Sequence, residues 1–228
     1  LNSGASLSLP TKQALLAALP GLRIIDVMGS TEGGNQGQHF SDKESSATGI
    51  YKPSPGNAVL SEGRDTILAP GHEGIGWWAR RRYVPLGYLD DETATLETFV
   101  TINGERLSIP GDRARLLANG EVELLGRNSL TINSGGEKIF VEEVENALKN
   151  HPKVLDVLVV GRASERWGEE AVAVVQLSAG AARDEADILN EAALHIARYK
   201  LPKAFVFVKQ VMRNPSGKPD YAWARSQV

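Results

Sequence analysis

The spacing of apolar residues predicts a helix followed by a strand in the first part of the chain. Residues 11–19 carry Leu15, Leu16 and Leu19 at helical spacing, and residues 22–27 form an apolar run of strand length. The strand leads into a turn of small and polar residues, which is where open α/β sheets hold their ligands. We therefore interpret residues 1–50 as an α/β segment.

The middle of the chain, residues 51–126, has a different pattern of short apolar runs separated by turn residues. Asn103-Gly104 and Asn119-Gly120 each lie between two such runs, and this dipeptide is a strong hairpin signal. The pattern predicts an antiparallel β unit or a small barrel.

Two clusters in this middle stretch have plain structural interpretations. Trp77 and Trp78 are neighbours and would point to opposite faces of a strand, so we expect one of them in the core. We interpret Arg80-Arg81-Arg82 as a solvated strand edge rather than an anion site, because charged side chains protect edges from aggregation.

The last hundred residues predict a compact α+β domain. Val141, Val144 and Leu148 share one face of a helix whose other positions are rich in glutamate. Runs of β-branched residues at 154–160, 171–177 and 204–208 predict strands, and residues 184–198 predict a second helix. We expect one domain at 1–126 and a mobile second domain at 127–228.

Composition excludes several functions. The 228 residues include 25 Lys and Arg against 28 Asp and Glu, a net charge of −3, which argues against nucleic acid as a partner. The chain has no Cys, which excludes thiol nucleophiles and Cys-bound metals and fits a reducing compartment. We expect a cytoplasmic location, either free or peripheral at a membrane. The sequence contains no run of 18 apolar residues, so it predicts no transmembrane segment. The chain begins at Leu1 without Met, so we expect it to be part of a longer protein.

Four segments carry unusual polar chemistry. Backbone amides of the turn Gly29-Ser30-Thr31-Glu32 could face a phosphate while its carboxylate shares a metal ion, although Ser-Thr-Glu also suits a helix cap. Asp112 at the entry of a strand could accept hydrogen bonds from ribose hydroxyls, although Asp is also common in turns.

The other two segments lie further along. The glycine pair Gly135-Gly136 lets the backbone approach a ligand closely, or simply makes a tight hairpin. Lys218 follows a glycine and could reach a phosphate as a point charge, although taken alone it is an ordinary exposed lysine.

Taken together and in order, these segments resemble the adenylate-forming superfamily of acyl-CoA synthetases, luciferases and peptide-synthetase adenylation domains. The sequence around Gly135-Gly136 is most similar to that of synthetases for fatty acids and steroid side chains. The matching segments are Ser3-Gly4-Ala5, Met28-Gly29-Ser30-Thr31-Glu32, Gly74-Ile75-Gly76, Gly87-Tyr88-Leu89, Glu92-Thr93-Ala94-Thr95, Gly111-Asp112, Gly126-Arg127, Ile132 to Ile139, Glu143-Val144-Glu145, Tyr199 to Lys203 and Ser216-Gly217-Lys218.

The resemblance implies roles for several of the matching residues. Lys218, Glu32 and Thr31 would be catalytic, with Glu32 also holding Mg²⁺. The nucleotide ATP or AMP and coenzyme A would be bound by Gly4, Ala5, Met28, Gly29, Ser30, Asp112, Arg127, Gly135 and Gly136. Arg127-Asn128-Ser129 would be the hinge of the mobile domain.

Three positions depart from the family pattern. Met28 replaces the aromatic residue beside adenine, Ser129 replaces a charged hinge residue, and Pro110 replaces the Thr before Gly111. Members of the family also carry an upstream phosphate loop with a lysine, which this chain lacks. The resemblance therefore implies the C-terminal half of a synthetase that needs the missing N-terminal part.

The resemblance implies activation of a small carboxylic acid, a fatty acid or a steroid side chain, to acyl-AMP and then acyl-CoA. We expect the chain alone to be inactive. Two alternatives stay open: an acyl-AMP ligase that loads a carrier protein, and a non-catalytic nucleotide- or CoA-binding module. A homodimer is a further expectation that the sequence leaves open.

Overall fold

The computed structural model describes residues 1–5 and 7–228, which divide into two compact units. The first unit consists of Leu1–Leu7 with Lys12–Ser129, and the second of Ser8–Thr11 with Leu130–Val228. The division at Ser129 falls three residues after the boundary predicted at 126/127, because strand β10 continues through Arg127. That the units act as separate domains stays a prediction.

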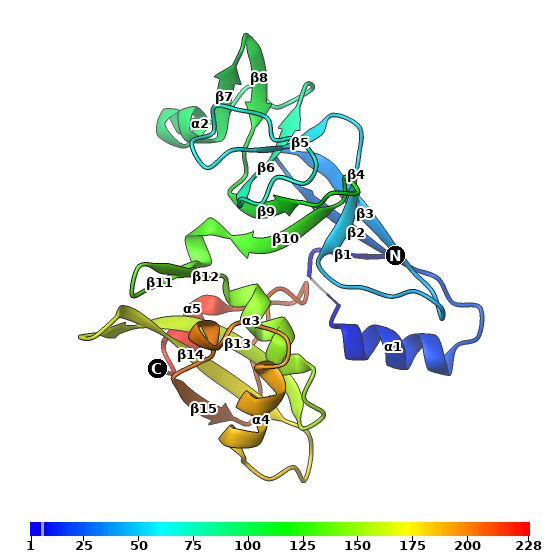
Figure 1. The fold of residues 1–228 in the computed structure, drawn as a ribbon, viewed down its shortest axis with the longest axis vertical. Coiled ribbons are helices and arrows are strands. Elements are labelled where there is room, and N and C mark those ends of the chain that lie inside the picture. The colour runs from blue at the N-terminus through cyan, green and yellow to red at the C-terminus, as the bar shows by residue number, and fades with distance from the viewer. Residues whose placement is uncertain (6) are drawn as a thin grey trace. The chain divides into compact units, whose positions relative to one another are not determined.

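The first unit is built on one ten-stranded sheet (Figure 1), in the order β1-β2-β3-β4-β10-β9-β6-β8-β7 with β5 beside β6. Strands β1 and β2 run parallel and the other neighbours run antiparallel. The strands are β1 Asn2–Ser3, β2 Ile24–Ser30, β3 Gly34–Ser41, β4 Ile50–Pro53, β5 Asn57–Leu60, β6 Gly76–Arg81, β7 Phe99–Ile102, β8 Glu105–Ser108, β9 Asp112–Leu116 and β10 Val122–Arg127. The helices are α2 Glu92–Thr98 and α1 Leu9–Ala18, of which the part from Lys12 onward belongs to this unit.

Both predicted hairpins are present. Asn103 and Gly104 join β7 to β8 with φ angles of 50° and 77°, the left-handed geometry that a two-residue hairpin turn requires. Asn119 and Gly120 lie in the turn between β9 and β10, which the amide of Leu117 closes by donating to the carbonyl of Glu121 over 2.9 Å.

The two tryptophans of β6 are both buried, so the expectation of a single core indole was wrong. Trp78 is fully buried beside Tyr51 and Val59 on one face of the sheet. Trp77 is 6% exposed on the other face, where the guanidinium groups of Arg64 and Arg113 lie 3.9 Å and 4.0 Å from its ring centroid. These cations cover the face that the sequence pattern left to solvent.

A buried ion pair fastens helix α1 to strand β2. Lys12 and Asp26 are 2% and 4% exposed, and Lys12 Nζ lies 2.6 Å from Asp26 Oδ2. The side chain of Asn2 donates to Asp26 Oδ1 over 2.7 Å, which joins β1 to the same carboxylate. Removal of one partner from such a buried pair costs about 3–5 kcal/mol, because the other charge is left without compensation.

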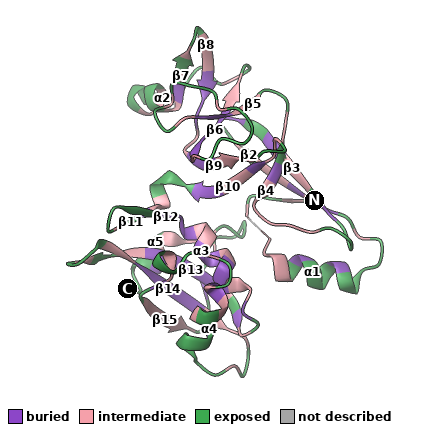
Figure 2. Cartoon of the chain, in the orientation of Figure 1, coloured by how far each residue is buried: buried purple, intermediate pink, exposed green. Residues whose placement is uncertain are grey.

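The second unit is a five-stranded sheet with helices on both faces (Figures 1 and 2). Helices α3 and α4 pack with the side chains of one face, and α5 packs with those of the other, around Leu158, Val174 and Val211. The elements are η1 Asn128–Leu130, β11 Ile132–Ser134, β12 Glu137–Ile139, α3 Val141–Lys149, β13 Val154–Ser164, β14 Gly168–Leu177, α4 Glu185–Ala192, η2 Arg198–Lys200, β15 Ala204–Val208 and α5 Tyr221–Arg225.

Helix α4 is shorter than the predicted helix over 184–198. It ends at Ala192, Leu194 is exposed, and Ala197 has an extended ψ of 143° before the short turn η2. This path lets Ile196 and Leu201 pack against the same core cluster as Ile188. Burial of these two side chains takes precedence over continuation of the helix.

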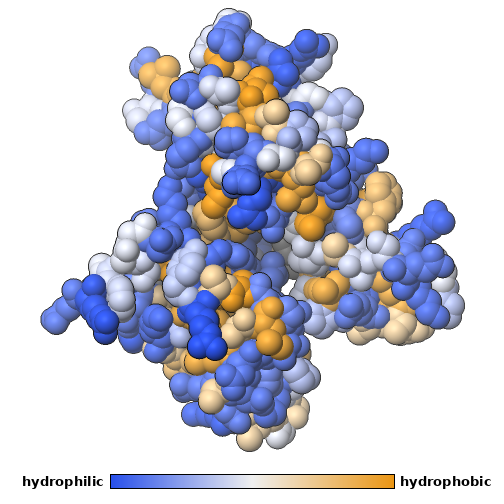
Figure 3. Space-filling model, in the orientation of Figure 1, coloured by the Kyte–Doolittle hydropathy of each residue, from blue (hydrophilic) through white to orange (hydrophobic). Residues whose placement is uncertain are grey.

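The visible surface in Figure 3 is mainly hydrophilic, with apolar side chains in scattered patches. Within residues 1–5 and 7–228, no helix is both long enough and apolar enough to span a membrane. The predicted fold, an α/β and antiparallel part followed by an α+β part, is confirmed by the fold comparison below.

The core of the second unit contains one carboxyl group of interest, Glu145 in α3. Its Oε1 accepts a hydrogen bond from the amide of Val159 over 2.9 Å, and its Oε2 accepts one from the hydroxyl of Tyr221 over 3.2 Å. Burial raises the pKa of Glu145 to about 7, against the lowering effect of Lys149 and of these hydrogen bonds. The native protein therefore keeps a proton on Glu145 at pH values where the unfolded chain has lost it.

This sets the first prediction, for the Glu145→Gln variant. The stabilisation that comes from a raised carboxyl pKa is complete below about pH 4.5 and is lost as the pH rises to about 7. The free energy of unfolding of the wild-type chain should therefore fall by about 3 kcal/mol relative to the variant over this range. Denaturant unfolding of both proteins between pH 4 and 8 measures this difference, and a constant difference would contradict it.

Candidate functional site

The turn between β2 and β3 presents the predicted residues Thr31 and Glu32. Its geometry depends on Gly29, where an added Cβ would lie 2.5 Å from the carbonyl oxygen of Gly34, so only glycine fits. The hydroxyl of Ser30 accepts a hydrogen bond from the amide of Gly33 over 2.9 Å. Ser30 therefore stabilises the turn, and Thr31 is exposed at its tip.

Glu32 is held by a residue to which the sequence analysis gave no role, Tyr88. The hydroxyl of Tyr88 donates to Glu32 Oε1 over 2.7 Å. Partial burial acts to raise the pKa of Glu32, but the hydrogen bond from Tyr88, with smaller contributions from Ser30 and Arg127, leaves this pKa below its ordinary value. Glu32 is therefore a carboxylate near neutral pH, with one oxygen fixed by Tyr88.

The segment that carries Tyr88 is fixed from two sides. The amide of Tyr88 donates to the Thr95 hydroxyl over 2.8 Å, and the Arg106 side chain donates to the carbonyl of Leu86 over 2.6 Å. The ring of Tyr88 also lies 5.6 Å from that of Phe99, centroid to centroid. Gly87-Tyr88-Leu89 was among the segments matched to the family, and this match was the only signal in the sequence.

Asp112 and Arg127 lie opposite each other on strands β9 and β10. Asp112 is 2% exposed, and Arg127 Nε lies 3.6 Å from its Oδ1, an ion pair longer than a hydrogen bond. The other oxygen, Oδ2, is buried and has no hydrogen-bond partner within the described residues. Such an oxygen is costly to leave unpaired and could accept a hydroxyl group of a ligand.

The charges of this region act on one another. Burial raises the pKa of Asp112, Arg127 opposes this effect and the charge of Glu32 adds to it. Glu32 and Asp112 are 80 residues apart in the sequence, yet the charge of Arg127 lowers the pKa of both. The first unit therefore brings Glu32, Asp112 and Arg127 into one electrostatic group.

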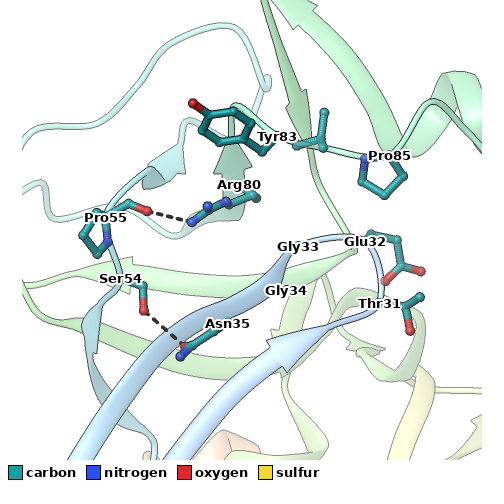
Figure 4. A pocket seen from close by; sticks show the side chains of 11 residues that line it. Thr31, Glu32, Gly33, Gly34, Asn35, Ser54, Pro55, Arg80, Tyr83 and Pro85 are labelled. Atoms are coloured by element: carbon teal, nitrogen blue, oxygen red, sulfur yellow. Dashed lines mark hydrogen bonds between the residues drawn. The ribbon is translucent and has the colours of Figure 1, made fainter.

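A cavity of about 630 Å³ opens beside the β2–β3 turn (Figure 4). Arg80 borders it and donates to the carbonyl of Pro55 over 2.6 Å, and the Ser54 hydroxyl donates to Asn35 over 3.1 Å. The expectation that the Arg80-Arg81-Arg82 cluster is only a solvated edge was therefore incomplete. The lining residues are Thr31, Glu32, Gly33, Gly34, Asn35, Ser54, Pro55, Arg80, Tyr83, Val84 and Pro85.

Three other predicted site residues, Met28, Gly4 and Ala5, lie in the first unit and make few polar contacts. Met28 is half-buried and packs against the cluster that contains Tyr51 and Trp78. Gly4 has a φ of 84° after strand β1, and the carbonyl of Ala5 accepts a hydrogen bond from the Asn2 side chain over 3.3 Å. Met28 therefore has a packing role that its sequence match did not indicate.

The glycine pair forms the tip of the β11–β12 hairpin in the second unit. Gly135 and Gly136 are exposed, with φ angles of 60° and 88°. Gly135 donates its amide to the carbonyl of Trp167 over 2.8 Å, and an added Cβ at Gly135 would lie 2.9 Å from the Trp167 ring. Trp167, in the β13–β14 turn, was not predicted as part of the site.

Lys218 also belongs to the second unit, in the loop before α5, where its side chain is exposed. The predicted residues thus fall into two groups, one in each unit. The carboxylates and the guanidinium group of the first unit can form hydrogen bonds and ion pairs with a polar ligand. The second unit offers a lysine and an accessible hairpin tip.

The available carboxylate and imidazole side chains limit which metal ion the chain could bind. Within the part of the chain that the structure describes, no three or more His, Asp or Glu side chains gather to hold one. Glu32 keeps one oxygen outside its bond with Tyr88. This fits Mg²⁺, which is usually bound through one or two carboxylates, with water and the phosphates of a substrate as its other ligands.

Comparison with known proteins shows which proteins this fold resembles. The profile of the AMP-binding enzyme C-terminal domain matches residues 143–218. The crystal structure of ATP-bound MatB from Rhodopseudomonas palustris aligns over 98% of this chain and 44% of its own, with a TM-score of 0.81 and 25% identity. The resemblance to adenylate-forming enzymes is therefore confirmed.

Curated relatives narrow the class. The medium-chain acyl-CoA ligase Mig of Mycobacterium avium is 54% identical over all of this chain and 41% of its own length. The 3-oxocholest-4-en-26-oate–CoA ligase of Rhodococcus rhodochrous is 45% identical over 100% of this chain and 41% of its own length. The chain is therefore similar to acyl-CoA ligases and spans less than half the length of these two relatives.

The hairpin tip gives the second prediction, through the matched variants Gly135→Ala and Gly136→Ala. Both replace a glycine with positive φ, but only Gly135 faces another side chain, the Trp167 ring, while nothing lies within 4 Å of a Cβ at Gly136. Gly135→Ala should displace the indole and increase quenching of tryptophan fluorescence by iodide, and Gly136→Ala should not. Equal quenching in the two variants would show that the ring does not pack on Gly135.

Proposed function

We propose that this chain is the C-terminal part of an AMP-forming acyl-CoA ligase. The carboxylate of a fatty acid or steroid side chain attacks the α-phosphate of ATP, which gives acyl-AMP and pyrophosphate. The thiol of coenzyme A then attacks the acyl carbonyl and releases AMP. The observation that carries the proposal is the group Glu32, Asp112 and Arg127, in which one buried carboxylate oxygen of Asp112 has no hydrogen-bond partner within the described residues.

In this proposal the first unit binds the nucleotide. Asp112 accepts the ribose hydroxyl groups, because its buried Oδ2 has no hydrogen-bond partner within the described residues, and Arg127 binds beside it. Thr31 contacts the phosphates from the tip of the β2–β3 turn. Glu32 supplies a carboxylate to Mg²⁺, which would offset phosphate charge when bound.

Lys218 is proposed to act in the first step. Negative charge on the α-phosphate oxygens grows as the carboxylate attacks, and a fixed cation directed at them lowers the barrier. The exposure of the Lys218 side chain at the end of a structured loop supports this role.

The second step requires a different arrangement of the same unit. We propose that the second unit rotates about Arg127-Asn128-Ser129, which withdraws Lys218 and brings Gly135 and Gly136 to the pantetheine arm of coenzyme A. A short hinge of this kind between compact units is a common device for alternating two active arrangements.

The proposal includes an upstream part of the same polypeptide, because the relatives extend well beyond the matched region. That part would supply the phosphate loop and most of the acyl pocket, so the chain alone should not catalyse either step. The predicted cytoplasmic location, the membrane contact and the homodimer stay predictions.

The third prediction concerns Asp112→Asn in the complete polypeptide. Hydrogen bonds to a charged group contribute about 1.5–3 kcal/mol, so the affinity for AMP should fall about ten- to a hundredfold. The fall should disappear for 2′,3′-dideoxy-AMP, which has no ribose hydroxyl groups to donate. Calorimetric titration of both proteins with both nucleotides measures this, and an equal loss for the dideoxy nucleotide would exclude ribose recognition by Asp112.

The fourth prediction tests the function itself through Lys218→Ala in the complete polypeptide. The rate of octanoate adenylation, measured by ATP–pyrophosphate exchange, should fall by about 10²–10³-fold. This is the usual loss when one fixed group that stabilises transition-state charge is removed. Thioester formation from supplied octanoyl-AMP should stay near the wild-type rate. Equal damage to both steps would refute the role given to Lys218.

A further inference from the structure

Lys218 lies in a loop that closes on the side chain of Asn214. The Oδ1 atom of Asn214 accepts hydrogen bonds from the amide of Ser216 over 3.0 Å and from that of Lys218 over 2.9 Å. The backbone adds bonds from the amide of Asn214 to the carbonyl of Lys218, 2.9 Å, and from the amide of Gly217 to the carbonyl of Asn214, 2.8 Å. The backbone below the lysine is therefore a closed turn rather than a free tail.

This turn is attached to the sheet by Arg213. Its Nη1 donates to the carbonyl of Gly217, the residue before Lys218, over 3.1 Å. The same guanidinium binds Asp156 of β13 with two hydrogen bonds, Nε to Oδ2 at 2.7 Å and Nη2 to Oδ1 at 2.8 Å. One planar side chain thus joins the lysine turn to strand β13, which pairs with β14 at one edge of the sheet.

Asp156 is well suited to anchor this cation. Partial burial acts to raise the pKa of Asp156, but the hydrogen bonds from Arg213 and the charge of Lys149, whose Nζ lies 3.2 Å from Oδ1, leave it below its ordinary value. Asp156 is therefore ionised near neutral pH, and the bidentate pair keeps its full charge.

The chain is also fixed on the other side of Lys218. Asp220 caps helix α5 by accepting the amide of Trp223 over 2.9 Å, and the hydroxyl of Tyr221 binds Glu145 inside the unit. Before the turn, the amide of Val211 donates to the side chain of Gln176 in β14 over 2.9 Å. Both ends of the loop are therefore fixed, and the exposed Lys218 is presented between them.

From these contacts we infer that Arg213 is a positioning residue for Lys218. The inference rests on the proposed role of Lys218 in adenylation. A lysine has a long flexible side chain, so the position of its ammonium group depends on how well its backbone is fixed. Misplacement of a reacting or charge-stabilising group by about 1 Å can cost about 10²-fold in rate.

A lysine at position 213 cannot replace this geometry. An ammonium group has no planar fork, so it cannot bind both oxygens of Asp156 and the carbonyl of Gly217 in one fixed arrangement. Arg213→Lys keeps the charge and Arg213→Gln removes it, which separates the effect of geometry from that of charge.

The fifth prediction uses these variants in the complete polypeptide, with octanoate and octanoyl-AMP as the probes. Arg213→Gln should lower adenylation at least tenfold and leave thioester formation near the wild-type rate, and Arg213→Lys should restore little of the loss. The double variant Arg213→Gln/Lys218→Ala should be no slower than Lys218→Ala alone, because a residue that acts through the lysine has no effect once the lysine is gone.

The matched control is Arg162→Gln. Arg162 makes a comparable pair with Glu170, Nη2 to Oε1 at 2.7 Å, in the β13–β14 hairpin away from the turn of Lys218. This variant should leave both steps unchanged. If Arg213→Gln lowers both steps equally, or multiplies the loss of Lys218→Ala, Arg213 is only structural and the inference fails. If Lys218→Ala itself spares adenylation, the proposed function fails first.

Discussion

The burial of Asp112 is the constraint on which the first unit depends. A carboxylate at the entry of β9 lies almost fully out of water, with one distant cation and one oxygen that no described group satisfies. This arrangement does not stabilise the folded state, because burial of a charge without a full set of partners is unfavourable. The sheet nevertheless places Arg127 directly across from it and Glu32 close enough to influence it. Strands β9 and β10 pair within the sheet, and Met28 of β2 packs against the cluster that contains Ala114 of β9 and Val122 of β10. Strand pairing and apolar packing therefore keep the members of this electrostatic group together.

Both units carry candidate residues on short turns, which lie after strand β2 in the first unit and before helix α5 in the second. In the first unit, the turn of Thr31 and Glu32 is fixed by close backbone contact at Gly29 and by the hydroxyl of Ser30. In the second, the turn of Lys218 is closed by Asn214 and joined to β13 through Arg213. Rigid strands restrict the turns without burying them, so side chains remain accessible while their backbones keep a defined path.

Local features of the fold could be read from the sequence, and long-range contacts could not. The hairpins at Asn103-Gly104 and Asn119-Gly120 depend on residues that adopt left-handed backbone conformations, a property of single positions. By contrast, Tyr88 reaches Glu32 across 56 residues and Arg213 reaches Asp156 across 57. No periodicity records such partners. The matched segments identified the candidate site residues, but which side chains hold them in place depends on packing that only the folded sheet provides.

The contact between Gly135 and Trp167 has a consequence for how these two positions can vary. The indole occupies the space that any side chain at position 135 would need. A larger residue at 135 therefore requires a smaller one at 167, and it must also tolerate a φ of 60°, which residues with a side chain rarely adopt. The two positions form a volume-matched pair, so their substitutions should arise together rather than one at a time.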